Sequence, residues 1–200
     1  MIVEFTGPPC AGKSTLIRAV EEQLFDSGFP VVIRSGTEGG LVELMRALLK
    51  PKLAGWAIRK PIIAAGTHGQ LLLRAAGVAM AARTDNRVVL FDEGTMKMAR
   101  RLDQRLLNDS LYKALPAPDI LVFVTCAREL RIARCRAEDR GFIRRVSDAE
   151  AIASSEDRRT KTRQFAATRS VKLLEFDTTD NEGPAAARDV IVDAITNYRR

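Results

Sequence analysis

The sequence predicts an α/β fold in which one parallel sheet is covered by helices on both faces. Short apolar runs, suited to buried strands, alternate along the chain with segments whose apolar residues recur at helical spacing. At 200 residues the chain can bury one such sheet between two helical layers. We therefore expect a three-layer α/β/α architecture in a single domain over residues 1–200.

The first strand and the first helix are predicted near the start of the chain. Residues 2–6, Ile-Val-Glu-Phe-Thr, form an apolar run that we interpret as a buried strand. A helix should follow, because apolar residues recur at helical spacing until Gly28 and Pro30 mark its end. These apolar residues are Leu16, Ile17, Val20 and Leu24.

Further strands are predicted where β-branched and other apolar residues form short runs. They lie at residues 31–33, 88–91, 120–124 and 171–176. Helical patterns fill the gaps between them, including residues 41–49, residues 62–82 and a last helix at residues 184–198. Because strands alternate with helices along the whole chain, we expect the strands to be parallel.

A phosphate-binding loop (P-loop) of the pattern G-x-x-x-x-G-K-S is predicted between the first strand and the first helix. Its residues are Gly7, Pro8, Pro9, Cys10, Ala11, Gly12, Lys13, Ser14 and Thr15. The glycines let backbone N–H groups approach a polyphosphate at the positive end of the helix dipole. Lys13 supplies a positive charge to the β- and γ-phosphates, and the Ser14 hydroxyl can bind a phosphate-bound Mg²⁺. The loop predicts a nucleoside triphosphate with Mg²⁺; we expect ATP, although the motif does not separate ATP from GTP.

A second chemical marker is Asp92-Glu93, at the end of the strand predicted at residues 88–91. Doubly wound sheets place reactive groups at the carboxyl ends of their strands. We expect Asp92 to hold Mg²⁺ opposite Ser14. Glu93 could accept a proton from an attacking hydroxyl, orient a water or bind part of the acceptor.

Cysteine usage and hydropathy predict a cytoplasmic protein. The three cysteines, Cys10, Cys126 and Cys135, have no metal-type spacing and are odd in number, which argues against a disulfide framework. We expect no secretory leader, because the P-loop follows the first residues directly. The longest apolar tract, residues 71–82, carries Arg74 and is too short to span a bilayer.

The P-loop, Asp92 and the arrangement of the later segments resemble the P-loop kinases of the nucleoside and nucleotide monophosphate kinase group, thymidylate kinases in particular. Residues 34–49 resemble the R-E-P-G-G-T segment and its helix, and Asp92 resembles the Asp of D-R-aromatic. The resemblance implies a five-stranded parallel sheet of spatial order 2-3-1-4-5. It also implies a helical acceptor-binding region at residues 34–82 and an arginine-rich lid region at residues 134–165 that closes over ATP.

The net charge of +7 and the arginines from Arg128 to Arg169 predict anionic ligands. Guanidinium groups over the triphosphate would neutralise charge that builds up on the transferred phosphoryl group. We expect this role for the lid residues Arg134, Arg140 and Arg144. A solvated basic face is expected instead for Arg128, Arg131, Arg158, Arg159 and Lys161.

Departures from the thymidylate kinase pattern bear on the acceptor. Glu93 stands where those enzymes carry an arginine after the Asp, and a carboxylate there would repel an acceptor phosphate. This favours a neutral hydroxyl-bearing or amine-bearing acceptor over thymidine monophosphate. The residues predicted to contact the acceptor are Arg34, Glu38, Arg74 and Glu93.

The sequence therefore predicts an ATP- and Mg²⁺-dependent kinase that acts on a small hydroxyl- or phosphate-bearing acceptor. The residues predicted to carry catalysis are Lys13, Asp92, Glu93, Arg134, Arg140 and Arg144. Two alternatives stay open: a polynucleotide 5′-hydroxyl kinase, and a P-loop ATPase or switch in which Glu93 activates water. An aromatic content of 6% disfavours the first alternative, because base stacking requires aromatic side chains. We expect a small molecule as partner and no membrane, and the oligomeric state is left open, a homodimer included.

Overall fold

The computed structural model describes residues 1–35, 87–96, 117–137, 148–180 and 183–198. In chain order its elements are β1 (Ile2–Thr6), α1 (Lys13–Asp26), β2 (Val31–Ser35), β3 (Val88–Asp92), β4 (Ile120–Thr125), α7 (Arg128–Ala137), α8 (Asp148–Arg169), β5 (Lys172–Asp177) and α9 (Gly183–Tyr198). Each strand lies within two residues of the run predicted for it.

The five described strands form one sheet of order β2-β3-β1-β4-β5, and every neighbouring pair is parallel. This confirms the predicted fold class and strand order. β1 is central, and its residue Phe5 lies in register with Asp92 of β3 and with Val122 of β4. The loop that follows β1 and the acidic end of β3 therefore emerge at the same edge of the sheet.

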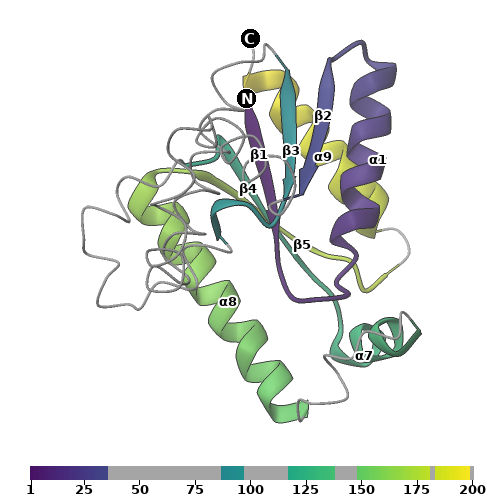
Figure 1. Cartoon of the computed structure of the whole chain (residues 1–200), viewed down its shortest axis with the longest axis vertical. Coiled ribbons are helices and arrows are strands. Elements are labelled where there is room, and N and C mark those ends of the chain that lie inside the picture. The colour runs from purple at the N-terminus through teal and green to yellow at the C-terminus, as the bar shows by residue number, and fades with distance from the viewer. Residues whose placement is uncertain (36–86, 97–116, 138–147, 181–182, 199–200) are drawn as a thin grey trace, which may run out of the picture.

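Helices cover both faces of the sheet (Figure 1). On one face α1 and α9 pack together over alternate strand residues such as Phe5, Leu90 and Val122, which form the main apolar core. On the other face α8 packs against β4 and β5, and it buries Phe165. Burial on both faces explains why the strands read as continuous apolar runs rather than as alternating patterns.

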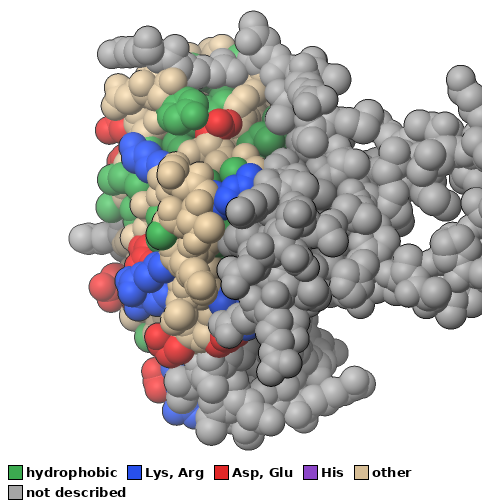
Figure 2. All heavy atoms as spheres, turned by 90° about the vertical axis from the view of Figure 1, so that its left-hand side faces the viewer, with side chains coloured by type: hydrophobic (Ala, Val, Ile, Leu, Met, Phe, Trp, Pro, Cys, Tyr) green, Lys and Arg blue, Asp and Glu red, His purple; other side chains and the backbone are tan. Residues whose placement is uncertain are grey.

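The α8 face carries charges of both signs. Figure 2 shows Lys and Arg side chains interspersed with Asp and Glu over the described part of this face. Glu175 of β5 accepts hydrogen bonds from Arg159 and Arg163 of α8, and Lys161 pairs with Asp157. These pairs keep the described part of the face from being uniformly basic.

Glu4 is a buried carboxylate in the central strand that the sequence analysis did not single out. Its side chain lies on the face of β1 away from α1 and is 1% exposed. It accepts hydrogen bonds from the backbone N–H groups of Thr95, at 2.8 Å, and Met96, at 2.6 Å. Since these two residues follow the Asp92–Glu93 turn, Glu4 fixes that turn against the sheet.

None of the helices that the structure describes combines the length and the apolar composition needed to cross a bilayer. The cytoplasmic location, the single domain and the oligomeric state stay predictions.

Candidate functional site

The P-loop (residues 7–15) turns sharply between β1 and α1. Gly7 has φ 146° and Gly12 has φ 85°, and Cys10 between them adopts φ 59°. A Cβ atom on Gly7 would lie 2.1 Å from the carbonyl oxygen of Val124 in β4, so only glycine fits this position. Left-handed residues within such a loop turn successive N–H groups to one side, which forms a concave site for an anion.

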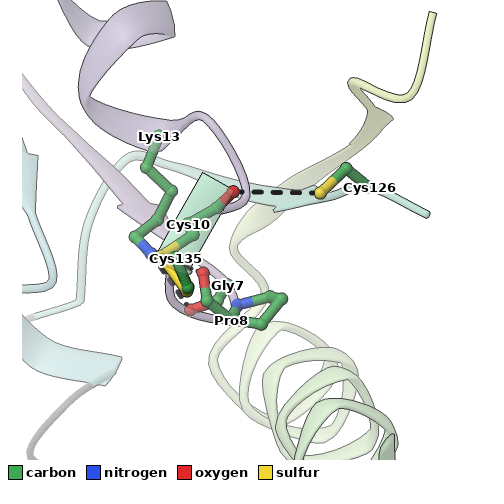
Figure 3. The surroundings of a disulfide bond; sticks show 6 residues. All are labelled: Gly7, Pro8, Cys10, Lys13, Cys126 and Cys135. Atoms are coloured by element: carbon green, nitrogen blue, oxygen red, sulfur yellow. Dashed lines mark hydrogen bonds between the residues drawn. A yellow bond between two sulfur atoms is a disulfide. The ribbon is translucent and has the colours of Figure 1, made fainter. Parts of the chain in front are cut away.

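Lys13 folds back into this loop. Its ammonium donates hydrogen bonds to the carbonyl oxygens of Gly7, at 3.2 Å, and Pro8, at 2.8 Å, and the residue is 9% exposed (Figure 3). The amine also lies 3.7 Å from Glu93 Oε1. A positive charge is thus held at the concave side of the loop, where it can bind a phosphate.

Asp92 ends β3 beside the start of α1. The Ser14 hydroxyl donates a hydrogen bond to Asp92 Oδ2 at 3.4 Å. The other carboxylate oxygen, Oδ1, is buried and has no hydrogen-bond partner among the described residues. A buried carboxylate oxygen without a donor, next to a hydroxyl, suits a small divalent cation, because Mg²⁺ prefers oxygen ligands. Ser14 and Asp92 are therefore the residues that could hold Mg²⁺.

Glu93 faces the P-loop. It adopts φ 55°, a left-handed conformation that is uncommon outside glycine, and its turn is anchored by Glu4 as described above. Its Oε1 atom lies 3.7 Å from the Lys13 amine and 3.9 Å from the Arg158 guanidinium. One carboxylate therefore lies between two cations at the mouth of the loop.

Arg158 contacts the P-loop, whereas the sequence predicted that it lies on a solvated basic face. Its NH1 group donates a hydrogen bond to the carbonyl oxygen of Gly7 at 3.3 Å. The prediction was wrong because α8 packs this arginine onto a loop 151 residues away in the sequence. A signal was present: Arg158 shares helical spacing with the buried residues Thr162, Phe165 and Ala166.

Two further arginines, Arg131 and Arg134, lie on α7. Arg131 is 6% exposed, so its assignment to a solvated face was wrong as well. Arg134 donates to the carbonyl oxygen of Thr178 at 3.5 Å, and its NH1 atom lies 3.5 Å from where a Cβ of Gly12 would be. Arg134 therefore lies beside the last glycine of the P-loop.

The loop after β5 holds the P-loop through Thr178, another residue that the sequence analysis missed as a site residue. Its buried hydroxyl lies 2.8 Å from the carbonyl oxygen of Ala11 and 3.2 Å from that of Thr125. The backbone N–H of Thr178 donates to the same Thr125 carbonyl at 2.8 Å. The P-loop is thus tied to β4 and to the loop after β5.

A disulfide bond joins Cys10 of the P-loop to Cys135 of α7, with a Cα–Cα distance of 5.5 Å (Figure 3). The sequence argued against a disulfide framework, and this was wrong for Cys10 and Cys135, because an odd count does not exclude one pair 125 residues apart. The third cysteine, Cys126, is free and buried, and its thiol donates to the Cys10 carbonyl at 3.9 Å. Burial raises the pKa of the Cys126 thiol despite the opposing charges of Arg134 and Arg131.

The structure brings together the residues of the P-loop, Asp92, Glu93 and Arg134. Of the remaining predicted site residues, Arg34 lies in β2 with its backbone in register with Phe91. The others lie outside the described residues; they are Glu38, Arg74, Arg140 and Arg144.

No protein-family model matches the sequence, and a comparison with characterised proteins finds no match either. Solved structures do match over almost the full length. A deoxyadenosine kinase from M. mycoides with bound dATP shares 14% identity and a TM-score of 0.58, over 98% of this chain and 100% of that one. The same enzyme with dCMP and dCDP bound shares 15% identity with a TM-score of 0.55. With dCTP bound, it shares 14% identity with a TM-score of 0.54, and the coverage is the same in both cases. The chain therefore has the fold of P-loop kinases.

Proposed function

We propose that the protein is an ATP- and Mg²⁺-dependent phosphotransferase that acts on a small acceptor of the nucleoside or nucleotide kind. The observation that carries the proposal is the convergence of Lys13, Glu93 and Arg158 on the concave side of the P-loop. The likeness to a deoxyadenosine kinase that binds dATP, dCMP and dCDP supports the same reaction class.

The charges at the loop favour a polyphosphate. Lys13 and Arg158 together carry two positive charges, and Glu93 offsets one of them. When ATP binds, we expect both cations to turn from the Gly7 carbonyl and from Glu93 to the β- and γ-phosphates. Arg158 then stabilises the charge that spreads over the transferred phosphoryl group, the task that the sequence analysis gave to the lid arginines.

Among the described residues, Glu93 is our candidate for contact with the acceptor. In the transfer, an acceptor hydroxyl oxygen forms a bond to the γ-phosphorus, the bond from that phosphorus to the β–γ bridging oxygen breaks, and Glu93 accepts the hydroxyl proton. Mg²⁺, held by Ser14 and Asp92, would supply charge neutralisation to the leaving ADP. A carboxylate at position 93 favours a neutral hydroxyl acceptor such as a nucleoside over a monophosphate.

The polynucleotide kinase alternative has less support. A polynucleotide would need a continuous basic surface along which its phosphates could bind. Positive and negative side chains are instead interspersed on the described part of the α8 face (Figure 2). The small-molecule acceptor is therefore the better proposal.

The proposal is tested by ADP release from Mg-ATP, measured alone and with separate pools of nucleosides, nucleoside monophosphates and 5′-hydroxyl oligonucleotides. We expect release that depends on a small-molecule pool, and we expect the nucleoside pool to be the strongest. The Lys13→Ala variant should abolish it. Release that is equal in all wells would show an ATPase, and release that depends only on oligonucleotides would show a polynucleotide kinase.

A further inference from the structure

The disulfide Cys10–Cys135 ties the P-loop to α7. Cys10 is the fourth residue of the loop and is partly exposed, whereas Cys135 is 2% exposed. The two elements are far apart in sequence, and α7 also carries Arg134 against the loop at Gly12. The covalent bond therefore links the middle of the loop to the helix that packs beside it.

Cys10 itself adopts a backbone conformation that is uncommon for residues other than glycine, and the shape of the loop requires this conformation. Its φ of 59° is left-handed, which L residues other than Asn and Asp rarely adopt. The disulfide holds the side chain of Cys10, and the Cys126 thiol contacts its carbonyl. Without the disulfide, the side-chain restraint on this conformation is lost, and the peptide groups of Cys10 can turn away from an anion.

We propose that Cys10 and Cys135 form a reversible redox site that controls nucleotide affinity. In the oxidised form the P-loop is held ready for the triphosphate. Reduction frees Cys10 from α7 and lowers the fraction of molecules whose loop can bind. This inference deepens the proposed function, on which its nucleotide-binding part rests.

The redox step is thiol–disulfide exchange with a dithiol reductant. A reductant thiolate attacks Sγ of Cys10, the more exposed of the two residues, and Cys135 leaves as a thiolate that takes a proton from water. The second thiolate of the reductant then attacks the reductant sulfur that is bonded to Cys10. Cys10 leaves as a thiolate and takes a proton from water, so the reductant gains a disulfide as the protein loses one. Arg131, four residues before Cys135 on α7 and buried like it, favours the departing thiolate. Glutathione disulfide, reduced to two glutathione thiols, reverses the reaction.

The test measures the Kd of a fluorescent ADP analogue with Mg²⁺ for the full chain, oxidised with glutathione disulfide or reduced with dithiothreitol. We expect reduction to weaken binding about tenfold, which corresponds to losing the restraint on one left-handed residue. The Cys135→Ser variant, kept in dithiothreitol so that Cys10 stays a free thiol, should bind like the reduced protein. The Cys126→Ala variant keeps the disulfide and should keep the redox response, which controls for effects of the reagents on the third thiol.

Equal affinity of the oxidised and reduced proteins would overturn the proposal, as would a Cys135→Ser variant in dithiothreitol that binds as tightly as the oxidised protein. Hydrogen exchange of the backbone amides of residues 7–14 is measured on the same samples. If the analogue binds neither form, the proposed function fails. In that case slower exchange in the oxidised form still supports redox control of the loop, and equal exchange overturns it.

Discussion

Replacing Gly7 by alanine should displace the P-loop, because the new Cβ atom would lie 2.1 Å from the Val124 carbonyl oxygen. A carbon and a carbonyl oxygen approach to about 3.3 Å in ordinary contact. The two atoms must therefore separate by about 1 Å. Val124 is fixed in β4, which is paired on both sides by β1 and β5. The loop, rather than the sheet, has to move.

Two costs follow from this displacement. The φ of 146° at Gly7 is unfavourable for alanine, and the overlap adds to it, for a loss of about 2–5 kcal/mol in the free energy of unfolding. A shift of about 1 Å in the P-loop also weakens its binding and positioning of the phosphates, on the order of a hundredfold. We therefore expect Gly7→Ala to lower both urea resistance and affinity for Mg-ATP.

Gly28→Ala is the matched control. Gly28 has φ 78°, and a Cβ atom there would meet nothing within 4 Å. It should cost only the conformational part, about 1–2 kcal/mol, and leave the affinity for Mg-ATP unchanged. Unfolding by urea and calorimetric titration with Mg-ATP measure the two effects. Equal losses of stability in the two variants, or an unchanged affinity in Gly7→Ala, would show that the Cβ atom does not displace the P-loop.

Three further predictions concern other parts of the chain. Arg158→Met should lower the rate of phosphoryl transfer about a hundredfold in a steady-state assay. The neighbouring control, Arg159→Met, should leave the rate unchanged, and equal rates in both variants would show that Arg158 takes no part in the transfer. Hydrogen bonds from Arg163 and from Arg159 lower the pKa of Glu175 below its ordinary 4.5, so this carboxylate stabilises the fold above that pH and the gain is lost as pH falls through the folded pKa. Urea unfolding of Glu175→Gln should thus show a deficit at pH 7 that vanishes in acid, and a deficit independent of pH would contradict this. Thr178→Val should cost about 1–3 kcal/mol in the same assay, because the Ala11 carbonyl oxygen loses its hydroxyl donor, whereas the Thr125 carbonyl keeps the backbone N–H of Thr178. Thr178→Ser should keep most of this stability, and equal losses in both variants would contradict that role.

Much of the fold could be predicted because its signals are local. Runs such as residues 88–91 and 120–124 are apolar throughout, as strands buried on both faces must be, and they lie inside β3 and β4. The strand order came from the resemblance to P-loop kinases, and the structure has that order. The P-loop was also a local signal, because its spacing is set by the turn itself.

The rest of the site depends on contacts between distant parts of the chain. Arg158, Thr178 and Glu4 reach their partners only through the packing of α8, the loop after β5 and β3. A short sequence pattern contains no information about such distances. The same holds for the Cys10–Cys135 bond, whose residues are 125 positions apart in the sequence. The roles predicted for Arg34, Glu38, Arg74, Arg140 and Arg144 stay predictions.

In the proposed function, this site transfers the γ-phosphoryl group of ATP to a small acceptor. The most direct test incubates the protein with Mg-ATP labelled with ¹⁸O in the γ-phosphate, together with the nucleoside pool, and follows the label by mass spectrometry. We expect the label to appear in a nucleoside monophosphate, and we expect the Lys13→Ala variant to form none. Label found only in inorganic phosphate, at the same rate with and without nucleosides, would contradict it.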